Sequence, residues 1–347
     1  MSHDHSHSHD HAAIPSTADP VLVEVTRGDM VESRHRGAAA IVDSQGNVVS
    51  AWGDIESPVY SRSALKPIQA IPLIESGAAE RFGLGDAEIA LACASHGGEP
   101  RHVEAVSAWL ARIGLSVADL ECGVQTPSHG PSAEALLLQG AKPTALNNNC
   151  SGKHTGFLSV AVHKGEKTTG YVKLEHPVQQ RILGVLEQLT EMNLGLAPKG
   201  IDGCGIPVIG VPLGRLAFAF ARMARPATLP KPRIAAIARI RKAMAAEPFM
   251  VAGSGRFCTR VMEALGERAV VKTGAEGVYI AILRDKGLGI ALKIDDGGTR
   301  ASEVALAALL QRCGVFDPAL ESALAVPVLN RAGLKVGEVR PSAILRD

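Results

Sequence analysis

The chain has few aromatic residues and almost no net charge. Phe, Trp and Tyr together make up 3% of its 347 residues, and the formal net charge is +1. The core must therefore be filled mainly by Ala, Val, Leu and Ile. A nearly neutral chain has no electrostatic reason to bind nucleic acid or an anionic membrane, so we predict neither as a partner.

Long apolar runs and closely spaced cysteines are also missing. No stretch approaches the roughly 18 uninterrupted apolar residues of a membrane-spanning helix, so none is predicted. The N-terminus carries no apolar signal segment, which favours a cytoplasmic location. The six cysteines form no C-x-x-C pair, and in a reducing compartment they are expected to be free thiols.

The first residues are rich in histidine. The tract MSHDHSHSHDH at 1–11 is of a kind that binds divalent metal loosely or stays unfolded. We predict a disordered tail over residues 1–19 and a single catalytic domain over residues 20–347.

Strand patterns occur at both ends of the chain. Alternation predicts strands at 21–27, 38–43 and 48–52, and again at 269–272, 278–283, 288–294 and 334–339. Helical periodicity lies between them, for example at 101–113, 214–224 and 232–246. We predict an α+β fold in which one antiparallel sheet is assembled from the N- and C-terminal strands, with helices packed on it.

Two short motifs indicate serine chemistry. Ser63 and Lys66 form an S-x-x-K, and Lys272 begins a downstream K-T-G; this order is typical of acyl-serine enzymes with the penicillin-recognising fold. Pro67 suits the first turn of a helix, so we expect a helix from residues 61–63 onward, kinked or shortened by Pro72. Ser63 and Lys66 then share a face. The alternative is that both lysines are ordinary surface or strand-end cations.

A lysine can act as the base for a serine only when it is neutral. At its reference pKa, neutralising it at pH 7 costs about 4.6 kcal/mol. Burial or a second cation lowers that pKa. Lys66 and Lys272 in one site would help each other, because one stays charged while the other is driven towards the neutral form.

Three glycine-bearing turns carry further reactive residues. Ser95 and His96 begin the turn SHGG, where a hydroxyl or backbone N–H groups can face a substrate. Cys150 and Cys204 lie in the polar turns NNCSGKH and DGCG, although buried structural thiols remain an alternative. In the loop AGSGR, Ser254 is expected to cap the following helix.

Taken together, the matching segments resemble the rhizobial-type (thermolabile) L-asparaginase family over roughly residues 20–340. They are SRSALKP (61–67), CASHGGEP (93–100), NNCSGKH (148–154), DGCGIP (202–207), VAGSGRFC (251–258) and KTGAEG (272–277). That family is similar in fold to serine β-lactamases and penicillin-binding proteins. The resemblance also implies a homodimer.

The resemblance implies two Ser-Lys pairs, Ser63 with Lys66 and Ser95 with Lys272. We favour Ser63 as the nucleophile.

It also implies one zinc ion per chain, held by Cys150, Lys153 and Cys204.

The positions expected to line the substrate pocket are Arg62, His96, His154 and Asp202. Charge matching would place Asp202 on the α-ammonium of asparagine and Arg62 on its α-carboxylate.

We therefore predict a zinc-containing L-asparaginase that forms an acyl-enzyme and releases L-aspartate and ammonia. Ser95-His96-Gly97 stands where the penicillin-processing enzymes have S-D-N, which favours a small amidase. Two alternatives stay open: a penicillin-interacting serine hydrolase, and a zinc- or amino-acid-binding protein without catalysis.

Overall fold

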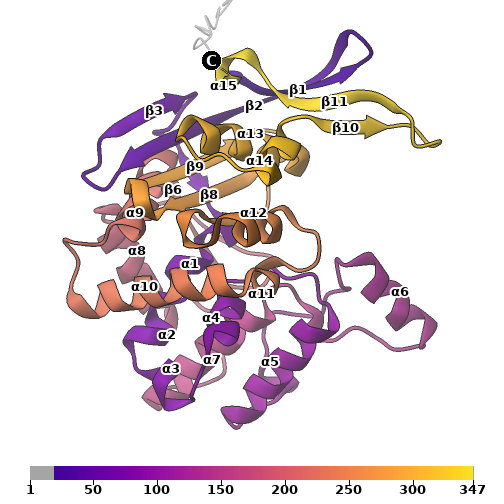
Figure 1. Ribbon diagram of the computed structural model, residues 1–347. Coiled ribbons are helices and arrows are strands. Elements are labelled where there is room, and N and C mark those ends of the chain that lie inside the picture. Colours follow the sequence, from indigo (N-terminus) through magenta and orange to yellow (C-terminus); the bar gives the residue numbers. More distant parts are fainter. Residues whose placement is uncertain (1–18, 347) are drawn as a thin grey trace, which may run out of the picture.

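The computed structural model describes residues 19–346, and its largest element is an antiparallel sheet built from both ends of the chain (Figure 1). The strands lie in the order β10-β11-β1-β2-β9-β8-β7, and β3 pairs with β2. Their bounds are β1 Val21–Arg27, β2 Met30–Asp43, β3 Val48–Trp52, β7 Val270–Thr273, β8 Val278–Leu283, β9 Leu288–Ile294, β10 Val326–Leu329 and β11 Lys335–Pro341. The predicted α+β class, with a sheet assembled from N- and C-terminal strands, is confirmed.

Strand β2 joins the two halves of this sheet. Its first part pairs with β1, and its second part pairs with β3 and β9. The sequence predicted only residues 38–43, because the exposed charges of Arg34 and Arg36 hide the strand pattern of the first part. From Ala38 to Val42 every side chain is buried, so this part of the strand is covered on both faces.

Helix α9 (Leu213–Ala224) covers one face of the sheet. Its backbone lies so close to β9 that a Cβ on Gly289 would stand 2.1 Å from the carbonyl oxygen of Ala217. Only glycine permits this approach. Ile282 pairs with Gly289 and therefore shares its face.

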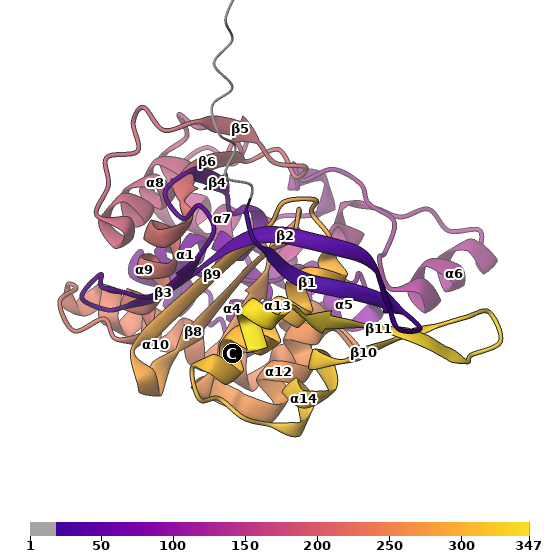
Figure 2. The same ribbon diagram turned by 90° about the horizontal axis from the view of Figure 1, so that it is seen from above.

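The opposite face is covered by α12 (Phe257–Leu265) and α13 (Thr299–Arg312), which lie together in Figure 2. Tyr279, an odd number of residues from Ile282, points to this face, and its ring packs edge-on against Phe257 with centroids 5.8 Å apart. Lys272 pairs with Ile280, which shares the face of Ile282. Lys272 therefore points to the α9 side of the sheet.

Most of the remaining helices form the lower part of the molecule in Figure 1. They are α1 Lys66–Gln69, α2 Ile71–Glu75, α3 Ala78–Arg81, α4 Asp86–Ala92, α5 Pro100–Arg112, α6 Gly130–Leu138, α7 Ser151–Lys164, α8 Pro177–Thr190, α10 Lys231–Ala246 and α11 Pro248–Ala252. Helices α14 (Pro318–Leu324) and α15 (Ala343–Arg346) lie beside the sheet.

The segment after Ser61 is broken into short pieces, where the sequence predicted one kinked or shortened helix. Residues 62–65 form a 3₁₀ turn, followed by α1 and, after Ala70, by α2. Pro67 and Pro72 each lie in the first turn of one short helix, where their missing N–H is no loss. Pro72 thus shortens the helix, as expected.

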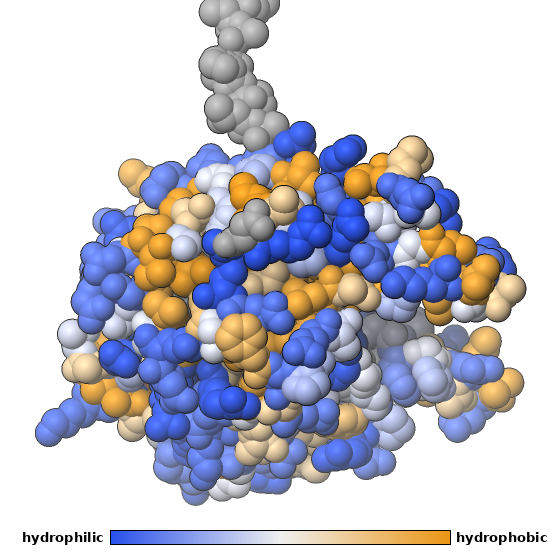
Figure 3. Space-filling view, turned by 45° about the horizontal axis from the view of Figure 1, so that its top comes forward, coloured by the Kyte–Doolittle hydropathy of each residue, from blue (hydrophilic) through white to orange (hydrophobic). Residues whose placement is uncertain are grey.

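Membrane spans and disulfides are both missing from the part of the chain that the structure describes. None of its helices has the length and apolarity needed to cross a bilayer. All six cysteines are buried and unpaired, as predicted. The predicted disordered tail falls almost wholly outside residues 19–346, and the single catalytic domain remains a prediction. The face drawn in Figure 3 mixes hydrophobic and hydrophilic residues.

Candidate active site

The four residues of the predicted Ser-Lys pairs come from three places in the fold. Ser63 lies in the 3₁₀ turn and Lys66 begins α1. Ser95 follows the end of α4, and Lys272 lies on β7, on the face that α9 covers. Lys66 and Lys272 are each only 1% exposed, so both amines are taken out of bulk water.

Both lysines converge on Ser95. The Nζ atom of Lys272 lies 2.8 Å from Ser95 Oγ, and that of Lys66 lies 3.0 Å from the same oxygen. The sequence paired Lys66 with Ser63, but within residues 19–346 no hydrogen bond joins these two side chains. Ser95 is therefore the serine that contacts two lysine amines, while Ser63 is half-buried.

The environment favours a neutral Lys272. Burial lowers its pKa from 10.5 to about 7, and the positive charge of Lys66 contributes to the shift. A neutral amine can take the proton of a serine hydroxyl at pH 7 with little free-energy cost. Lys272 is thereby suited to act as a base.

The loop that carries Ser95 is fixed by its neighbours. The amide of Ser95 donates to the carbonyl of Val251 in α11 at 2.9 Å, and His96 Nε2 lies 3.0 Å from Ser151 Oγ. Farther along the loop, Glu99 accepts hydrogen bonds from Ser254 N at 2.7 Å and Ser254 Oγ at 2.6 Å. Such second contacts hold a reactive hydroxyl in place.

The role expected for Ser254 was wrong. Helix α12 begins at Phe257 with Arg256 in the capping position, and Ser254 instead binds the carboxylate of Glu99. Sequence reasoning missed Glu99 as the anchor of the Ser95 loop. A partner more than a hundred residues away leaves no local signal.

Cys150, Lys153 and Cys204 also come together. Lys153 Nζ lies 3.0 Å from Cys204 Sγ, and the thiol of Cys204 hydrogen-bonds to Cys150. That hydrogen bond, with the charge of Lys153, holds the pKa of Cys150 well below its usual value, while it raises the pKa of Cys204 together with burial. Although burial opposes it, the negative sulfur of Cys150 raises the pKa of Lys153.

These three side chains fit a zinc site with three protein donors. Zinc binds two thiolate sulfurs and one nitrogen in open sites whose fourth position takes water or substrate. There the nitrogen is ordinarily an imidazole, and here it is a lysine amine. The amine must lose a proton to become a ligand, and a bound cation favours that loss. Residues 19–346 contain no group of three or more His, Cys, Asp or Glu placed to hold a metal, so the lysine would be an essential ligand.

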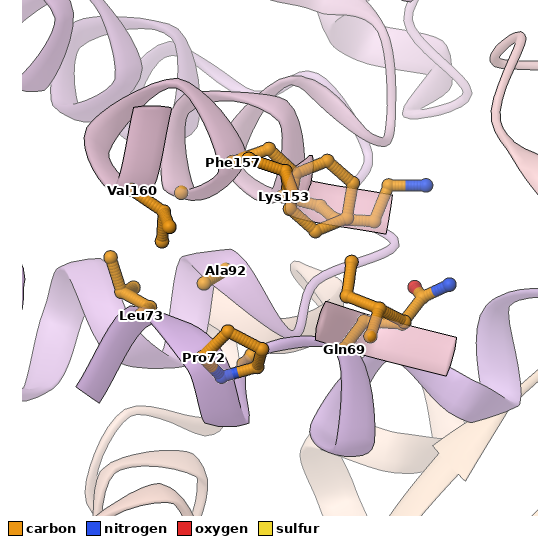
Figure 4. Close-up of a pocket in the computed structure, with 11 residues that line it drawn as sticks. Gln69, Pro72, Leu73, Ala92, Lys153, Phe157 and Val160 are labelled. Atoms are coloured by element: carbon orange, nitrogen blue, oxygen red, sulfur yellow. The ribbon is translucent and has the colours of Figure 1, made fainter. Parts of the chain in front are cut away.

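The stem of Lys153 lines a small cavity of about 10 Å³ between α1–α2 and α7 (Figure 4). Pro72, Leu73 and Val160 form its apolar part, and the polar ends of Gln69 and Lys153 lie on one side of it. The cavity is only about large enough for one water molecule. Beyond this cavity the Lys153 amine lies 3.0 Å from Cys204 Sγ.

The small second sheet brings Arg62 to Asp202. Strands β4 (Pro58–Tyr60) and β5 (Lys199–Ile201) both pair antiparallel with β6 (Pro207–Pro212), so they run parallel and end on the same side. Arg62 and Asp202 follow those two ends, and Arg62 donates to Asp202 Oδ1 from Nε at 3.1 Å and from an NH₂ group at 2.9 Å.

His154 lies deeper in the protein. Its Nδ1 lies 2.8 Å from the hydroxyl of Tyr171, and that hydroxyl accepts a hydrogen bond from the amide of Glu121 at 2.8 Å. The contact with Tyr171 uses one ring nitrogen, Nδ1. The other, Nε2, is buried without a hydrogen-bond partner among the described residues. The structure thus leaves one ring nitrogen of His154 open.

The chain matches a known protein family over most of its length. A family model described as L-asparaginase II matches residues 23–341, a range that includes every residue of the site. Comparison with curated proteins found no match.

Similar solved structures include a beta-lactamase from Mycobacterium bovis, with a TM-score of 0.40, 15% identity, and coverage of 80% of this chain and 94% of that one. A D-alanine carboxypeptidase from Burkholderia cenocepacia gives a TM-score of 0.37 at 12% identity, with coverage of 78% and 93%. Unliganded simvastatin synthase from Aspergillus terreus gives 0.37 at 13% identity, with coverage of 80% and 94%.

Proposed function

The chain belongs to the L-asparaginase II family, and on that premise we propose that it hydrolyses the side-chain amide of L-asparagine to L-aspartate and ammonia. The observation that carries the proposal is the hydroxyl of Ser95, which lies 2.8 Å from Lys272 Nζ and 3.0 Å from Lys66 Nζ. A serine in contact with a buried lysine of lowered pKa is an activated nucleophile, which suits the attack on an amide.

In the proposed reaction, Lys272 takes the proton of Ser95 as its oxygen attacks the amide carbon. Collapse of the tetrahedral intermediate breaks the carbon–nitrogen bond, and ammonia leaves with a proton returned from the lysine. The acyl-enzyme is an ester of Ser95, and a water molecule deprotonated by the same lysine releases aspartate. Ser63 and Lys66 act beside this centre. Because Lys66 contacts Ser95, the geometry favours Ser95 over Ser63 as the nucleophile.

The substrate is proposed to bind between the Ser95 loop and the end of the small sheet. Arg62 carries the positive charge that suits an α-carboxylate, and Asp202, His96 and His154 are proposed to line the pocket with it. The cytoplasmic location and the assembly as a homodimer remain predictions from the sequence.

We also propose zinc as a cofactor, held by Cys150, Lys153 and Cys204. When bound, the ion would supply a positive charge that positions or polarises a group of the substrate. The apolar cavity around the Lys153 stem supports the orientation that the amine would need.

The function is tested by measuring ammonia and aspartate release from L-asparagine by the purified full chain. We expect both products in equal amounts. A mass adduct of a β-lactam on a serine without ammonia release would favour the penicillin-interacting alternative. Stoichiometric binding of asparagine without product would favour a binding protein.

The zinc proposal is tested by metal analysis of three full-length forms: wild type, Cys204→Ser and Cys313→Ser. Cys313 is also buried but lies at the end of α13, away from Lys153. After dialysis against metal-free buffer, we expect the Cys204 variant alone to lose about one zinc per chain. Because all three forms share the histidine-rich tract, their difference reports on the site. Equal zinc content in all three would contradict the assignment.

A further inference from the structure

Two of the three non-glycine residues with positive φ in the described chain lie at the proposed site. Arg62 has φ +49° and Glu276 has φ +60°; the third, Glu191, terminates helix α8. Left-handed backbone is unfavourable for residues with a side chain, and such strain concentrates where a side chain must be aimed for function. Arg62 immediately precedes Ser63, and Glu276 lies in the β7–β8 turn four residues after Lys272.

The loops that carry these two residues touch. A Cβ on Gly274 would stand 2.6 Å from the carbonyl oxygen of Ser61 and 3.2 Å from the amide of Ala64. The β7–β8 turn is therefore packed directly on the 3₁₀ turn that contains Ser63. Glu276, two residues after Gly274, is exposed at this junction.

The negative charge of Glu276 raises the pKa of Arg62, although no hydrogen bond or salt bridge joins the two side chains. The pKa of Arg62 is raised first by its hydrogen bonds to Asp202, and the negative charges of Asp202 and Glu276 contribute to the rise. In the part of the chain that the structure describes, Glu276 has neither a salt bridge nor a side-chain hydrogen bond. Its Oε2 lies against Gly297 in the turn after β9, and its charge acts on Lys293 as well as on Arg62.

The site needs such a carboxylate if its substrate carries an ammonium group. It contains the cationic side chains of Arg62, Lys66 and Lys153, while Lys272 is the neutral base and is not counted with them. The charge of Asp202 is offset by Arg62 at 2.9 Å and by the nearby Lys153. The other carboxylate near Ser95, that of Glu99, is already bound by Ser254 through two hydrogen bonds. A further positive charge would be repelled unless another carboxylate received it.

We propose that Glu276 is a specificity-determining residue that selects substrates with a free α-ammonium group, acting opposite Arg62, which takes the α-carboxylate. This inference rests on the proposed function and deepens it. Arg62 binds the α-carboxylate and Glu276 binds the α-ammonium of a zwitterionic amino acid, while Ser95 attacks the side-chain amide. An amide that has the carboxylate but lacks the ammonium gains nothing from Glu276.

The test compares L-asparagine with succinamic acid, which is asparagine without its amino group. In Glu276→Gln we expect the ratio of kcat/KM values, asparagine over succinamate, to fall by up to about fivefold. The loss should appear mainly in KM for asparagine, because the ion pair is made equally in the ground and transition states. Hydrolysis of succinamate should be unchanged. Glu276→Asp, which keeps the charge, should retain part of the preference.

Glu321→Gln is the matched control, because Glu321 is an exposed carboxylate on α14. It should leave the ratio unchanged. If the wild type releases ammonia and the ratio does not change in Glu276→Gln, the inference is overturned while the proposed function stands. If the wild type releases ammonia from neither compound, the proposed function fails and this inference fails with it.

Discussion

Replacing Ser95 with alanine is expected to reduce kcat/KM for L-asparagine by at least about 10³-fold. The substitution removes the hydroxyl to which both Lys66 and Lys272 are hydrogen-bonded, at 3.0 and 2.8 Å. Without it no acyl-enzyme can form at this position, and only the slow attack of water remains. The measurement is steady-state ammonia release, together with intact-mass detection of an aspartyl adduct after acid quenching.

Two other serine variants show whether the loss is specific to Ser95. Ser63→Ala should lose less activity than Ser95→Ala and should still form the adduct, because no lysine is hydrogen-bonded to Ser63 in the described structure. Ser322→Ala, on the surface of α14, should behave like the wild type. An adduct on Ser63, or a larger loss in Ser63→Ala, would reverse the assignment.

Replacing Lys272 with methionine is expected to reduce kcat by about 10²–10⁴-fold, the usual contribution of a general base. Methionine keeps the length of the buried stem and removes only the amine. Lys272→Arg should lose a similar factor, because a guanidinium stays protonated and cannot accept the proton of Ser95. Lys286→Met, in the exposed β8–β9 turn of the same sheet, is the control. Wild-type rates in Lys272→Met would exclude Lys272 as the base.

The pH dependence of the rate follows from the titration of Lys272. Because the pKa of Lys272 is about 7, its amine is neutral above pH 7 and protonated below it. The wild-type rate should therefore fall about tenfold per pH unit below pH 7 and level off above it. The residual activity of Lys272→Met should lack this acidic limb. A wild-type rate that is flat between pH 5 and 7 would contradict the assignment.

In Lys272→Met, stability should rise although activity falls. A base whose folded pKa lies below its unfolded value binds fewer protons when folded, so stability rises with pH between the two values. For Lys272 the shift from 10.5 to about 7 corresponds to roughly 5 kcal/mol of destabilisation, fully present below pH 7. Lys272→Met is freed of this penalty, so its free energy of unfolding at pH 6 should equal or exceed that of the wild type. This outcome would separate loss of the base from loss of the fold.

The sequence predicted those parts of the fold that leave a periodic pattern. The strands at both ends alternate, and α5, α9 and α10 carry apolar stripes, so their class and positions were found. Helix α6 was not, because none of its residues is buried and it has no apolar stripe to detect. The first part of β2 was hidden by exposed charges such as Arg34.

The structure brings together residues that the sequence selected, but not every contact that the sequence implied. Ser63, Lys66, Ser95 and Lys272 were all identified by motif, and the structure places Lys272 at Ser95 as expected. Lys66 reaches Ser95 instead of Ser63 at the segment just after α4, where its amine also hydrogen-bonds to the carbonyl oxygen of Ala94. Local spacing does not encode such a contact, and the same holds for the clamp between Glu99 and Ser254.

The order of the strands along the chain has a consequence for synthesis of the protein. Strands β1 and β2 leave the ribosome first, but their partners β9 and β11 follow only after most of the chain has been made. Until then the buried part of β2 presents an unpaired apolar edge, which invites association with other nascent chains. Closing the sheet late and over long loops is slow. Because Lys272 reaches Ser95 across 177 residues of chain, catalytic competence is acquired near the end of folding.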